Sequence, residues 1–499
     1  MSSVIAQIDH EADLPVRTQI SSAYAAAIRS GALKPGAALP SIRALSSRLR
    51  VSPATVVAAY RELCDSGLAS AQPRSSFRVA GLPEDGVRTE TGDEAGGAAS
   101  GVTVINGGST VSGAYAPELR SGRGVYALNR IEPDLRIHPA REFAATIASV
   151  AVADVSIGGY EEYRGCPALR EAIAAFDRER GIDSDPVNGM LITSGAQQAI
   201  QLLGRSFPSG TAIAVEDPCY PGARLAFSGN GARLVPVRVG ADGPDAESLA
   251  AIARPGAVAA FYCCPTYANP SGRTWSEAAR IRTLEAARAG GFLVVEDDYL
   301  GDLDYCAERP ISLAALAERV PGARVLRVRT FSKCLLPALR IASVTGEPAI
   351  VSRLLALKVA DDIGCSAFIQ RALARFVDSG QYAAHLERVR PRYRATREAL
   401  REALATPIEG LEFEDPPAGL SLLARVSGSL DAARFVAECA REGALVSPGS
   451  DSWLDPAEGR SRLRLCFGSL APEEVHPAID TLRRAASAAR ITSPVFSMI

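Results

Sequence analysis

Residues 330–340 read TFSKCLLPALR and directly follow the segment ARVLRVR at 323–329, which predicts a buried strand. The stretch contains Lys333, and the whole chain has only two other lysines, Lys34 and Lys358. A Schiff base requires an amine on a sheltered loop near groups that bind phosphate. Lys34 belongs to a basic N-terminal segment and Lys358 to the predicted helix SRLLALKVADD, so Lys333 is the candidate for this chemistry.

The chain around this stretch alternates short apolar runs with helical segments from about residue 185 onward. The apolar runs are TAIAVEDP, ARLVPVRV, AVAAFYCCP, GFLVVEDDY, ARVLRVRTFSK and RIASVTGE. Strands this apolar, separated by segments such as SEAARIRTLEAARAG, predict a mostly parallel sheet covered by helices. We therefore expect an α/β domain whose ligands bind at the strand ends and in the loops that follow them.

Residues suited to binding a phosphate group occur after one of these strands and, further upstream, before a predicted helix. Hydroxyl groups and a guanidinium group close to Lys333 can hold phosphate oxygens. A second set precedes a predicted helix in ITSGAQQAI, where backbone amides and the helix dipole favour the same anion. The residues are Thr330, Ser332 and Arg340 in the first set and Ser194, Gly195, Ala196 and Gln197 in the second.

Four further residues could hold an aromatic cofactor ring. Asp297, at the end of GFLVVEDDY, can pair with a protonated pyridine nitrogen. Tyr299 and Asn269 could form hydrogen bonds with a phenolic oxygen, and Tyr220 in EDPCYPG offers a face for stacking. Each could alone be an ordinary strand-end polar residue or a core aromatic. Because all four occur in this order along one chain, however, they are not four independent observations, and the ordinary interpretation cannot be weighed for each residue separately.

The N-terminal segment differs from the rest in charge. Residues 14–80 contain nine cations and two anions, a net charge of +7, so the remainder carries −9 for the chain to total −2. A basic segment attached to an acidic body is typical of a nucleic-acid-binding module joined to another domain. The alternative is that the arginines cover a solvated face.

The local sequence of this segment predicts a winged helix-turn-helix over residues 14–80. PVRTQISSAYAAAIRSGAL has helical spacing of apolar residues and stops at Gly31. Ser41 and Ser52 can cap two further helices, SIRALSSRL and SPATVVAAYRELCDSG, joined by a tight turn. LASAQPRSSFRVA then predicts two short strands around a basic turn.

Residues 81–113 are rich in glycine, serine and acidic residues and have few large apolar side chains. Such a segment cannot bury enough surface to fold, so it predicts a flexible linker between the module and a body over residues 114–490.

Composition excludes several classes of protein. We find no apolar run long enough to cross a bilayer, and the acidic N-terminus lacks the basic and apolar regions of a secretory signal, so we expect a cytoplasmic protein. The ten cysteines include no CxxC motif, which fits neither a disulfide framework nor a zinc finger. Cys263 and Cys264 are predicted to be buried strand residues.

The order LxxGxLKPGxxLPSxRxLxxxLxVSxxTVxxAYxxLxxxGL resembles the DNA-binding domain of the GntR family of bacterial transcription regulators. Pro53 stands where relatives often carry a base-contacting arginine, and Ser76 replaces the usual wing glycine, so the DNA site can differ from the commonest one. The alternative is a winged helix used only for protein contacts. The resemblance implies DNA contacts by Arg43, Ser52, Thr55 and the wing residue Arg74.

The motifs SGAQQA, EDPCYPG, NPSG, EDDY, FSKxxxPxLR and RLCFG, in this order over about residues 115 to 485, resemble fold type I enzymes that depend on pyridoxal 5′-phosphate (PLP). The resemblance implies a mostly parallel large domain and a smaller α+β domain. A domain of this type joined to a GntR-type module is similar to the architecture of the MocR-type regulators. It further implies that Lys333 forms the Schiff base with PLP, that Arg464 grips a substrate or effector carboxylate, and that Tyr160 lies near a dimer interface and reaches the partner's phosphate.

The leading hypothesis is a homodimeric regulator that binds double-stranded promoter DNA and senses PLP, or an amino compound that reacts with PLP at Lys333. The rival hypothesis is an active aminotransferase with an accessory DNA-binding head. Asn269 is retained here, as in working aminotransferases, whereas many MocR-type regulators carry an aromatic residue there. A body that only mediates assembly is disfavoured because the whole cofactor set is retained.

Overall fold

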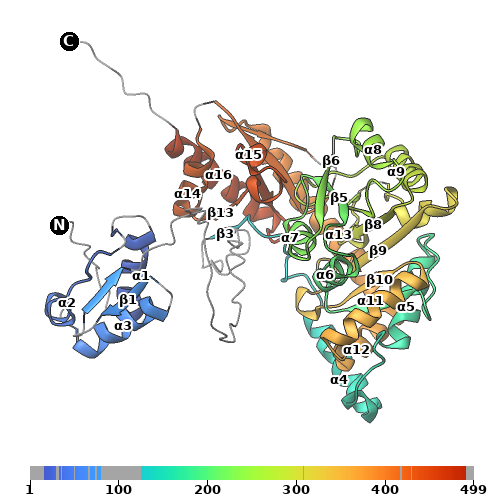
Figure 1. Cartoon of the computed structure of the whole chain (residues 1–499), viewed down its shortest axis with the longest axis horizontal. Coiled ribbons are helices and arrows are strands. Elements are labelled where there is room, and N and C mark those ends of the chain that lie inside the picture. The colour runs from blue at the N-terminus through green and yellow to red at the C-terminus, as the bar shows by residue number, and fades with distance from the viewer. Residues whose placement is uncertain are drawn as a thin grey trace, which may run out of the picture. The chain divides into compact units, whose positions relative to one another are not determined.

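A computed structural model describes residues 16–29, 33–34, 36–49, 51–65, 68–72, 76–79, 125–306, 308–415, 418–428 and 430–490. The chain divides into two compact units, residues 1–106 and 107–499 (Figure 1). The predicted linker, residues 81–113, lies outside the described residues, so its limits stay a prediction.

The N-terminal unit contains three helices and a strand pair around its own core. Side chains from all three helices and from the second strand meet in that core, including Tyr24, Leu45, Tyr60 and Val79. The Tyr60 hydroxyl donates a hydrogen bond to the carbonyl of Pro40, 2.9 Å away. The elements are α1 (Val16–Arg29), α2 (Ile42–Leu49), α3 (Pro53–Asp65), β1 (Ala69–Gln72) and β2 (Ser76–Val79), with the two strands antiparallel.

The large unit is built on a seven-stranded sheet in the order β4-β10-β9-β8-β7-β5-β6. Strand β10 is antiparallel to both of its neighbours, and the pairs from β9 to β6 are parallel, so the sheet is mostly parallel as predicted. The strands are β4 (Met190–Thr193), β5 (Ala212–Asp217), β6 (Arg233–Arg238), β7 (Ala260–Cys263), β8 (Leu293–Asp298), β9 (Arg324–Thr330) and β10 (Ala342–Thr345).

Helices cover both faces of this sheet. Successive strand residues point in opposite directions, so neighbouring residues of one strand pack with different helices. Ile213 and Val215 of β5 pack with α6, α7 and α11, whereas Ala214 packs with α8, α9 and α10. Cys263 and Cys264 are buried as predicted. The helices are α6 (Ala196–Ser206), α7 (Pro221–Gly229), α8 (Ala246–Ile252), α9 (Glu277–Gly290), α10 (Leu313–Leu316) and α11 (Pro348–Asp361).

A further layer packs against the edge of the large sheet that carries β4 and β10. Helices α4 (Ala140–Ala153), α5 (Pro167–Arg178) and α12 (Ala367–Asp378) lie together in Figure 1 and share one apolar core. The short 3-10 helix η2 (Val155–Gly158) follows α4.

A smaller α+β subdomain completes the large unit. Its antiparallel sheet has the order β11-β12-β15-β14, and β13 pairs in parallel with β3. Helices α13, α14 and α16 share a core with these strands. The elements are β3 (Tyr126–Ala127), α13 (Gln381–Ala405), β11 (Leu411–Phe413), β12 (Ser421–Val426), α14 (Ala432–Glu442), β13 (Ala444–Leu445), β14 (Ser447–Pro448), α15 (Pro456–Gly459), β15 (Arg462–Cys466) and α16 (Pro472–Ala489).

Helix α13 links the two parts of the large unit. Its first half places Tyr382 and Tyr393 in the core next to the large sheet, and its second half places Leu400 and Ala403 in the core of the subdomain. Across the described ranges, no helix is both long enough and apolar enough to cross a bilayer.

Candidate functional site

A cavity of about 300 Å³ lies where several strands of the large sheet end. Parallel strands bring the residues that follow them to one edge of a sheet, which is why segments far apart in sequence meet there. The predicted residues that line the cavity are Ala196, Gln197, Tyr220, Asn269, Asp297, Tyr299, Thr330, Ser332, Lys333, Arg340 and Arg464.

Lys333 lies in the turn that follows β9, and its amine is largely enclosed. Burial lowers the pKa of this amine, with the carboxylate of Glu132 acting in the opposite direction. Among the described residues Lys333 has no hydrogen bond or ion pair. By contrast, Lys358 is buried in α11 and paired with Asp362, and Lys34 is exposed in the N-terminal unit. Lys333 is therefore the lysine placed to act as a nucleophile.

Asp297 lies on β8 at the floor of the cavity. Its Oδ2 accepts a hydrogen bond from the Tyr262 hydroxyl, while its Oδ1 is buried without a partner. Burial raises the pKa of Asp297 to about 7, against the opposing effect of that hydrogen bond. An unpartnered carboxylate oxygen this deeply buried is costly, and groups with such perturbed pKa values cluster at functional sites.

Arg464, on β15 of the subdomain, reaches the cavity from the opposite side. Its guanidinium donates from Nη1 to Asn269 Oδ1 at 3.0 Å. It donates from Nη2 to the carbonyl of Asn129 at 2.8 Å and to Ser447 Oγ at 3.1 Å. Its Nε is buried without a partner. Arg464 and Asn269 are thus brought together directly, which the sequence did not predict.

The residues predicted to bind phosphate gather at one end. Arg340, at the left-handed backbone angle φ 51°, donates from Nη2 to the carbonyl of Ser194 at 3.3 Å. A Cβ atom on Gly195 would lie 2.5 Å from that Nη2, so a glycine is required for the guanidinium to approach. The hydroxyl groups of Thr330 and Ser332 are 3.1 Å apart. This set places a cation and two hydroxyl groups beside the start of α6.

Two predicted phosphate ligands lie beside the cavity and not in its lining. Gly195 supports Arg340 as described, and the backbone amide of Ser194 donates to Gln198 Oε1 at 2.8 Å. The Ser194 hydroxyl lies 3.4 Å from the thiol of Cys365. Ala196 and Gln197 are the members of this turn that face the cavity.

The two tyrosines have partners within the chain. The Tyr220 hydroxyl donates to Gln197 Oε1 at 3.0 Å, which fixes the ring at the cavity wall. The Tyr299 hydroxyl donates to the carbonyl of Tyr267 at 2.6 Å. Because that hydroxyl has a single hydrogen, it can act toward a ligand only as an acceptor while this bond lasts.

Tyr160 lies apart from the cavity in this single chain, and 85% of its surface is exposed. Of the residues predicted to contact DNA, Arg43 is exposed on α2, and Ser52 caps α3 by accepting from the Thr55 amide at 3.1 Å. The hydroxyl groups of Ser52 and Thr55 are 2.8 Å apart. Arg74 lies outside the described residues.

Sequence reasoning missed the segment that covers the cavity near Lys333. Asn129, Arg130, Ile131 and Glu132 all line it, and Asn129 Oδ1 is buried without a partner. This segment precedes every strand of the large sheet and carries no motif of its own. Strand β4 was not predicted either, although the helix that follows it was.

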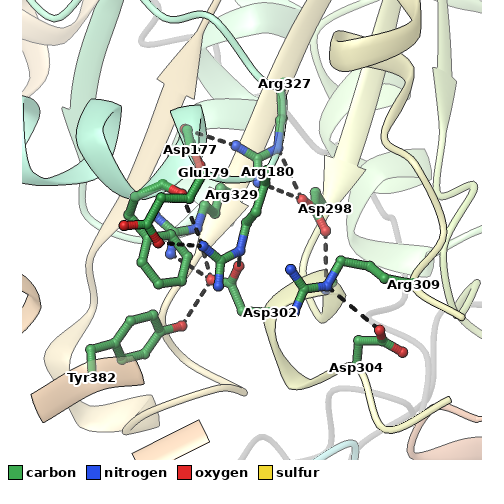
Figure 2. Close-up of polar contacts among 12 residues, drawn as sticks. Asp177, Glu179, Arg180, Asp298, Asp302, Asp304, Arg309, Arg327, Arg329 and Tyr382 are labelled. Carbon is green, nitrogen blue, oxygen red and sulfur yellow. Dashed lines mark hydrogen bonds and ion pairs between the residues drawn. The ribbon is translucent and has the colours of Figure 1, made fainter. Parts of the chain in front are cut away.

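A second polar cluster involves β8, which carries Asp297, and β9, which precedes Lys333 (Figure 2). Arg327 of β9 contacts Asp177 at 3.0 Å and Asp298 of β8 at 2.7 Å. Arg329 donates from Nε to Asp302 Oδ2 at 2.8 Å, and the Tyr382 hydroxyl bonds the same oxygen at 2.8 Å. We call these residues, with Arg180, the buried ion-pair network.

Asp302 is the acidic residue that the arginines of the network hold in its charged form. Although burial opposes ionisation of Asp302, the guanidinium groups of Arg329 and Arg180 hold its pKa at about 2. Arg180 also lies over the Phe176 ring, with its guanidinium carbon 3.3 Å from the ring centroid. The network fixes β8, β9, α5 and α13 relative to one another.

Comparison with known proteins matches these two units to two families. The model of the bacterial regulatory proteins of the gntR family matches residues 17–79, and that of aminotransferase class I and II matches residues 133–482. The chain is a MocR-type protein, a GntR domain joined to an aminotransferase class I and II domain.

Relatives of this MocR-type protein share the whole arrangement. The HTH-type transcriptional regulator TauR of Rhodobacter capsulatus is 29% identical, over 92% of this chain and 94% of TauR. The probable rhizopine catabolism regulatory protein MocR of Rhizobium meliloti is 28% identical, over 96% and 95%. The aminotransferase domain resembles the crystal structure of LysN, an α-aminoadipate aminotransferase of Thermus thermophilus complexed with N-(5′-phosphopyridoxyl)-L-leucine. The match has a TM-score of 0.67 and 28% identity, and it covers 74% of this chain and 93% of LysN.

Proposed function

We propose that this MocR-type protein is a DNA-binding transcription regulator that holds PLP at Lys333 and senses PLP itself or an amino compound that reacts with it. One observation carries the proposal. One cavity is lined by Lys333, which has no hydrogen bond or ion pair among the described residues, and by Asp297, whose Oδ1 is buried without a partner, and the same chain carries a GntR domain.

The lining of the cavity fits PLP group by group. When bound, PLP would supply an aldehyde group for Schiff-base chemistry at the Lys333 amine and a ring that withdraws electrons. Asp297 Oδ1 would accept a hydrogen bond from the protonated pyridine nitrogen, which gives the unpartnered oxygen its donor. Arg340 and the start of α6 would hold the phosphate, and the Tyr220 ring would cover one face.

The effector side of the cavity is cationic. Arg464 Nε has no partner, and the two Nη groups are held in place by Asn269, Asn129 and Ser447. A guanidinium held this way favours a ligand with a carboxylate group. If an amino compound is the effector, we therefore propose an amino acid or a similar carboxylate-bearing amine.

Exposed apolar side chains support a homodimer. Val152, Val155, Tyr160, Tyr163 and Phe368 are all exposed on α4, η2, α12 and the segment after η2. Apolar surface gathered in this way is typical of an interface between subunits. We propose that a second copy covers it and that Tyr160 reaches the partner's phosphate site.

The N-terminal unit supports DNA binding by its charge and its exposed residues. Residues 14–80 carry a net charge of +7, Arg43 is exposed, and Thr55 lies in the first turn of α3. The start of such a helix enters the major groove in helix-turn-helix proteins. We propose that Arg43, Ser52, Thr55 and Arg74 contact DNA.

The direct test of regulation measures binding of the full chain to the DNA that flanks its own gene, with and without PLP. We expect PLP to change the affinity of the wild type but not of Lys333→Ala, and Arg43→Ala to weaken binding of both. Removal of residues 1–80 is expected to abolish binding. If the truncated chain still binds the fragment, or if Lys333→Ala responds to PLP like the wild type, the proposal is wrong.

An active aminotransferase is the second candidate, and the Arg464–Asn269 contact favours it because it completes a substrate-binding side of the cavity. The holoprotein should be incubated with amino donors and a keto acid. Sustained turnover would favour the enzyme. A change in the visible spectrum without turnover would favour the sensor.

A further inference from the structure

Two buried histidines contact the backbone that follows Lys333. His138 lies just before α4 and His385 lies on α13, and their ring centroids are 4.9 Å apart. The chain has four histidines, so half of them meet at this one place. Neither lines the cavity, and the proposed PLP chemistry uses neither.

The hydrogen bonds of His138 determine which nitrogen carries its proton. Nδ1 bonds the carbonyl of Leu335, and since a carbonyl only accepts, Nδ1 is the donor. Nε2 lies 2.9 Å from the Tyr393 hydroxyl, whose oxygen accepts from the backbone amide of Asp134 at 3.1 Å. The Tyr393 hydrogen is thus free to be donated to Nε2, and the ring is neutral.

The same reasoning applies to His385. Its Nε2 lies 3.1 Å from the carbonyl of Cys334 and must be the donor. Its Nδ1 faces Arg388 Nη2 at 3.4 Å, so Nδ1 is the acceptor. Burial, with His138 next in effect, lowers the pKa of His385 to about 3, and burial also lowers the pKa of His138. Each ring therefore donates one hydrogen bond to a backbone carbonyl, from Nδ1 in His138 and from Nε2 in His385.

The two carbonyls belong to the two residues that directly follow Lys333. We propose that His138 and His385 are positioning residues that hold Lys333 at the cavity by donating hydrogen bonds to the carbonyls of Leu335 and Cys334. The inference rests on the proposed function, because the ligand that Lys333 meets there is PLP. It assigns the histidines no contact with PLP itself.

The pair also connects Lys333 with the subdomain. His385 and Tyr393 lie on α13, and the same helix contributes Leu400 and Ala403 to the subdomain core. A shift of the subdomain that moves α13 therefore reaches the backbone next to Lys333 through these hydrogen bonds.

The test uses the full-length protein and compares variants that lose the N–H donor of each histidine with variants that keep an N–H there. His138→Phe and His385→Phe remove the donor and keep an aromatic ring. His138→Asn and His385→Gln keep an N–H near the place of Nδ1 and Nε2, respectively. His476→Phe, on the exposed surface of α16, is the control. The readouts are the PLP dissociation constant, from the visible absorbance, and the melting temperature of the apoprotein.

A third readout needs no PLP. The apoprotein is treated with an amine-acylating ester, and peptide mass spectrometry compares labelling of Lys333 with that of exposed Lys34. Because the chain contains three lysines, each labelled peptide is unambiguous. This ratio reports the exposure and placement of the Lys333 amine directly.

We expect each Phe variant to raise the PLP dissociation constant about fivefold to tenfold, the size of one lost hydrogen bond. We also expect a several-fold higher ratio of Lys333 to Lys34 labelling. The Asn and Gln variants should stay within about twofold of the wild type by the same measure. The control should not differ from it.

Two results would overturn the inference. One is a Phe variant with wild-type PLP affinity and wild-type Lys333 labelling. The other is an Asn or Gln variant as weak as its Phe counterpart, since packing and not the donated bond would then be the cause. If a Phe variant does not fold, the Asn and Gln variants decide by themselves. Failure of the wild type to bind PLP would instead overturn the proposed function, and the labelling ratio would still test the histidines.

Discussion

The two faces of strands β8 and β9 treat buried charge in opposite ways. On one face, Asp298, Arg327 and Arg329 of the buried ion-pair network each lie against an opposite charge. On the other, Asp297 and Lys333 line a cavity, and among the described residues neither forms an ion pair. Adjacent residues, Asp297 and Asp298, thus have different tasks. The ion-paired residues of the network hold the strands together. We propose that Asp297 and Lys333, which have no ion pair among the described residues, interact with a ligand.

The largest expected effect comes from breaking the network. Asp302→Asn leaves Arg329 and Arg180 without their carboxylate, and an uncompensated buried charge costs about 3–5 kcal/mol of unfolding free energy. Denaturant unfolding of the apoprotein measures it. Glu285→Gln, exposed on α9, is the control and should change stability by less than about 0.5 kcal/mol. A loss below about 1 kcal/mol in Asp302→Asn would show that the network is not a scaffold.

The corresponding aspartate-to-asparagine substitution on the other face should lower the affinity for PLP and leave the stability of the apoprotein unchanged. Asp297→Asn removes the carboxylate that would meet the pyridine nitrogen, so PLP affinity is expected to fall by about 10–150-fold, equivalent to one charged hydrogen bond. The apoprotein should be no less stable than the wild type, since Asp297 Oδ1 has no partner to lose. Equal PLP affinity in mutant and wild type would contradict the assignment.

Sequence patterns identified the cavity face far better than the network face. Lys333, Asp297 and Arg464 were predicted because a cavity at strand ends draws on short loops that carry local motifs. The network was not predicted, because ARVLRVRT looks like an ordinary apolar strand whose arginines are exposed. Its acidic partners come from α5, β8 and η3 (Gly301–Leu303), and no local spacing links them to β9.

The same limit explains the other omissions. The segment at 129–132 and the histidines at 138 and 385 contact the Lys333 region only after the chain has folded back on itself. Strand β4 is four residues long, so its apolar run is too short to be distinguished from the start of the next helix. Strands β7 and β10 are equally short, but they were predicted because they lie in longer runs of the sequence, AVAAFYCCP and RIASVTGE.

The pH dependence of stability should have opposite signs for Asp297 and Asp302. Burial raises the pKa of Asp297 to about 7, so between about pH 4 and 7 the native state holds a proton that the unfolded state has lost, and stability from this group falls as pH rises. The pKa of Asp302 is held at about 2, so its contribution is lost only as pH falls through about 4 toward 2.

Unfolding of the apoprotein from pH 4.5 to 8 can measure this. We expect the free energy of unfolding of the wild type to fall by about 1–3 kcal/mol more than that of Asp297→Asn as pH rises across this range. Glu216, whose pKa burial raises to about 8, leaves part of the decline in place. Identical slopes in wild type and Asp297→Asn would show that Asp297 is ionised in the apoprotein.

The smallest effect concerns the hydrogen bond that Tyr262 donates to Asp297. Tyr262→Phe removes the donor and keeps the ring, so the Asp297 carboxylate is less stabilised. We expect PLP affinity to fall by about threefold to tenfold, the size of one hydrogen bond. Visible absorbance titration measures it, with Tyr126→Phe on β3, which does not line the cavity, as the control. A loss as large as that of Asp297→Asn would place Tyr262 in direct contact with the ligand.

We propose that the cavity face holds PLP on Lys333. Sodium borohydride reduction of the full-length protein with PLP, followed by peptide mass spectrometry, tests it most directly. We predict one modified peptide, the one that contains Lys333, and loss of both this label and the visible absorbance in Lys333→Ala. An unmodified Lys333, or a label spread equally over Lys34, Lys333 and Lys358, would contradict the account.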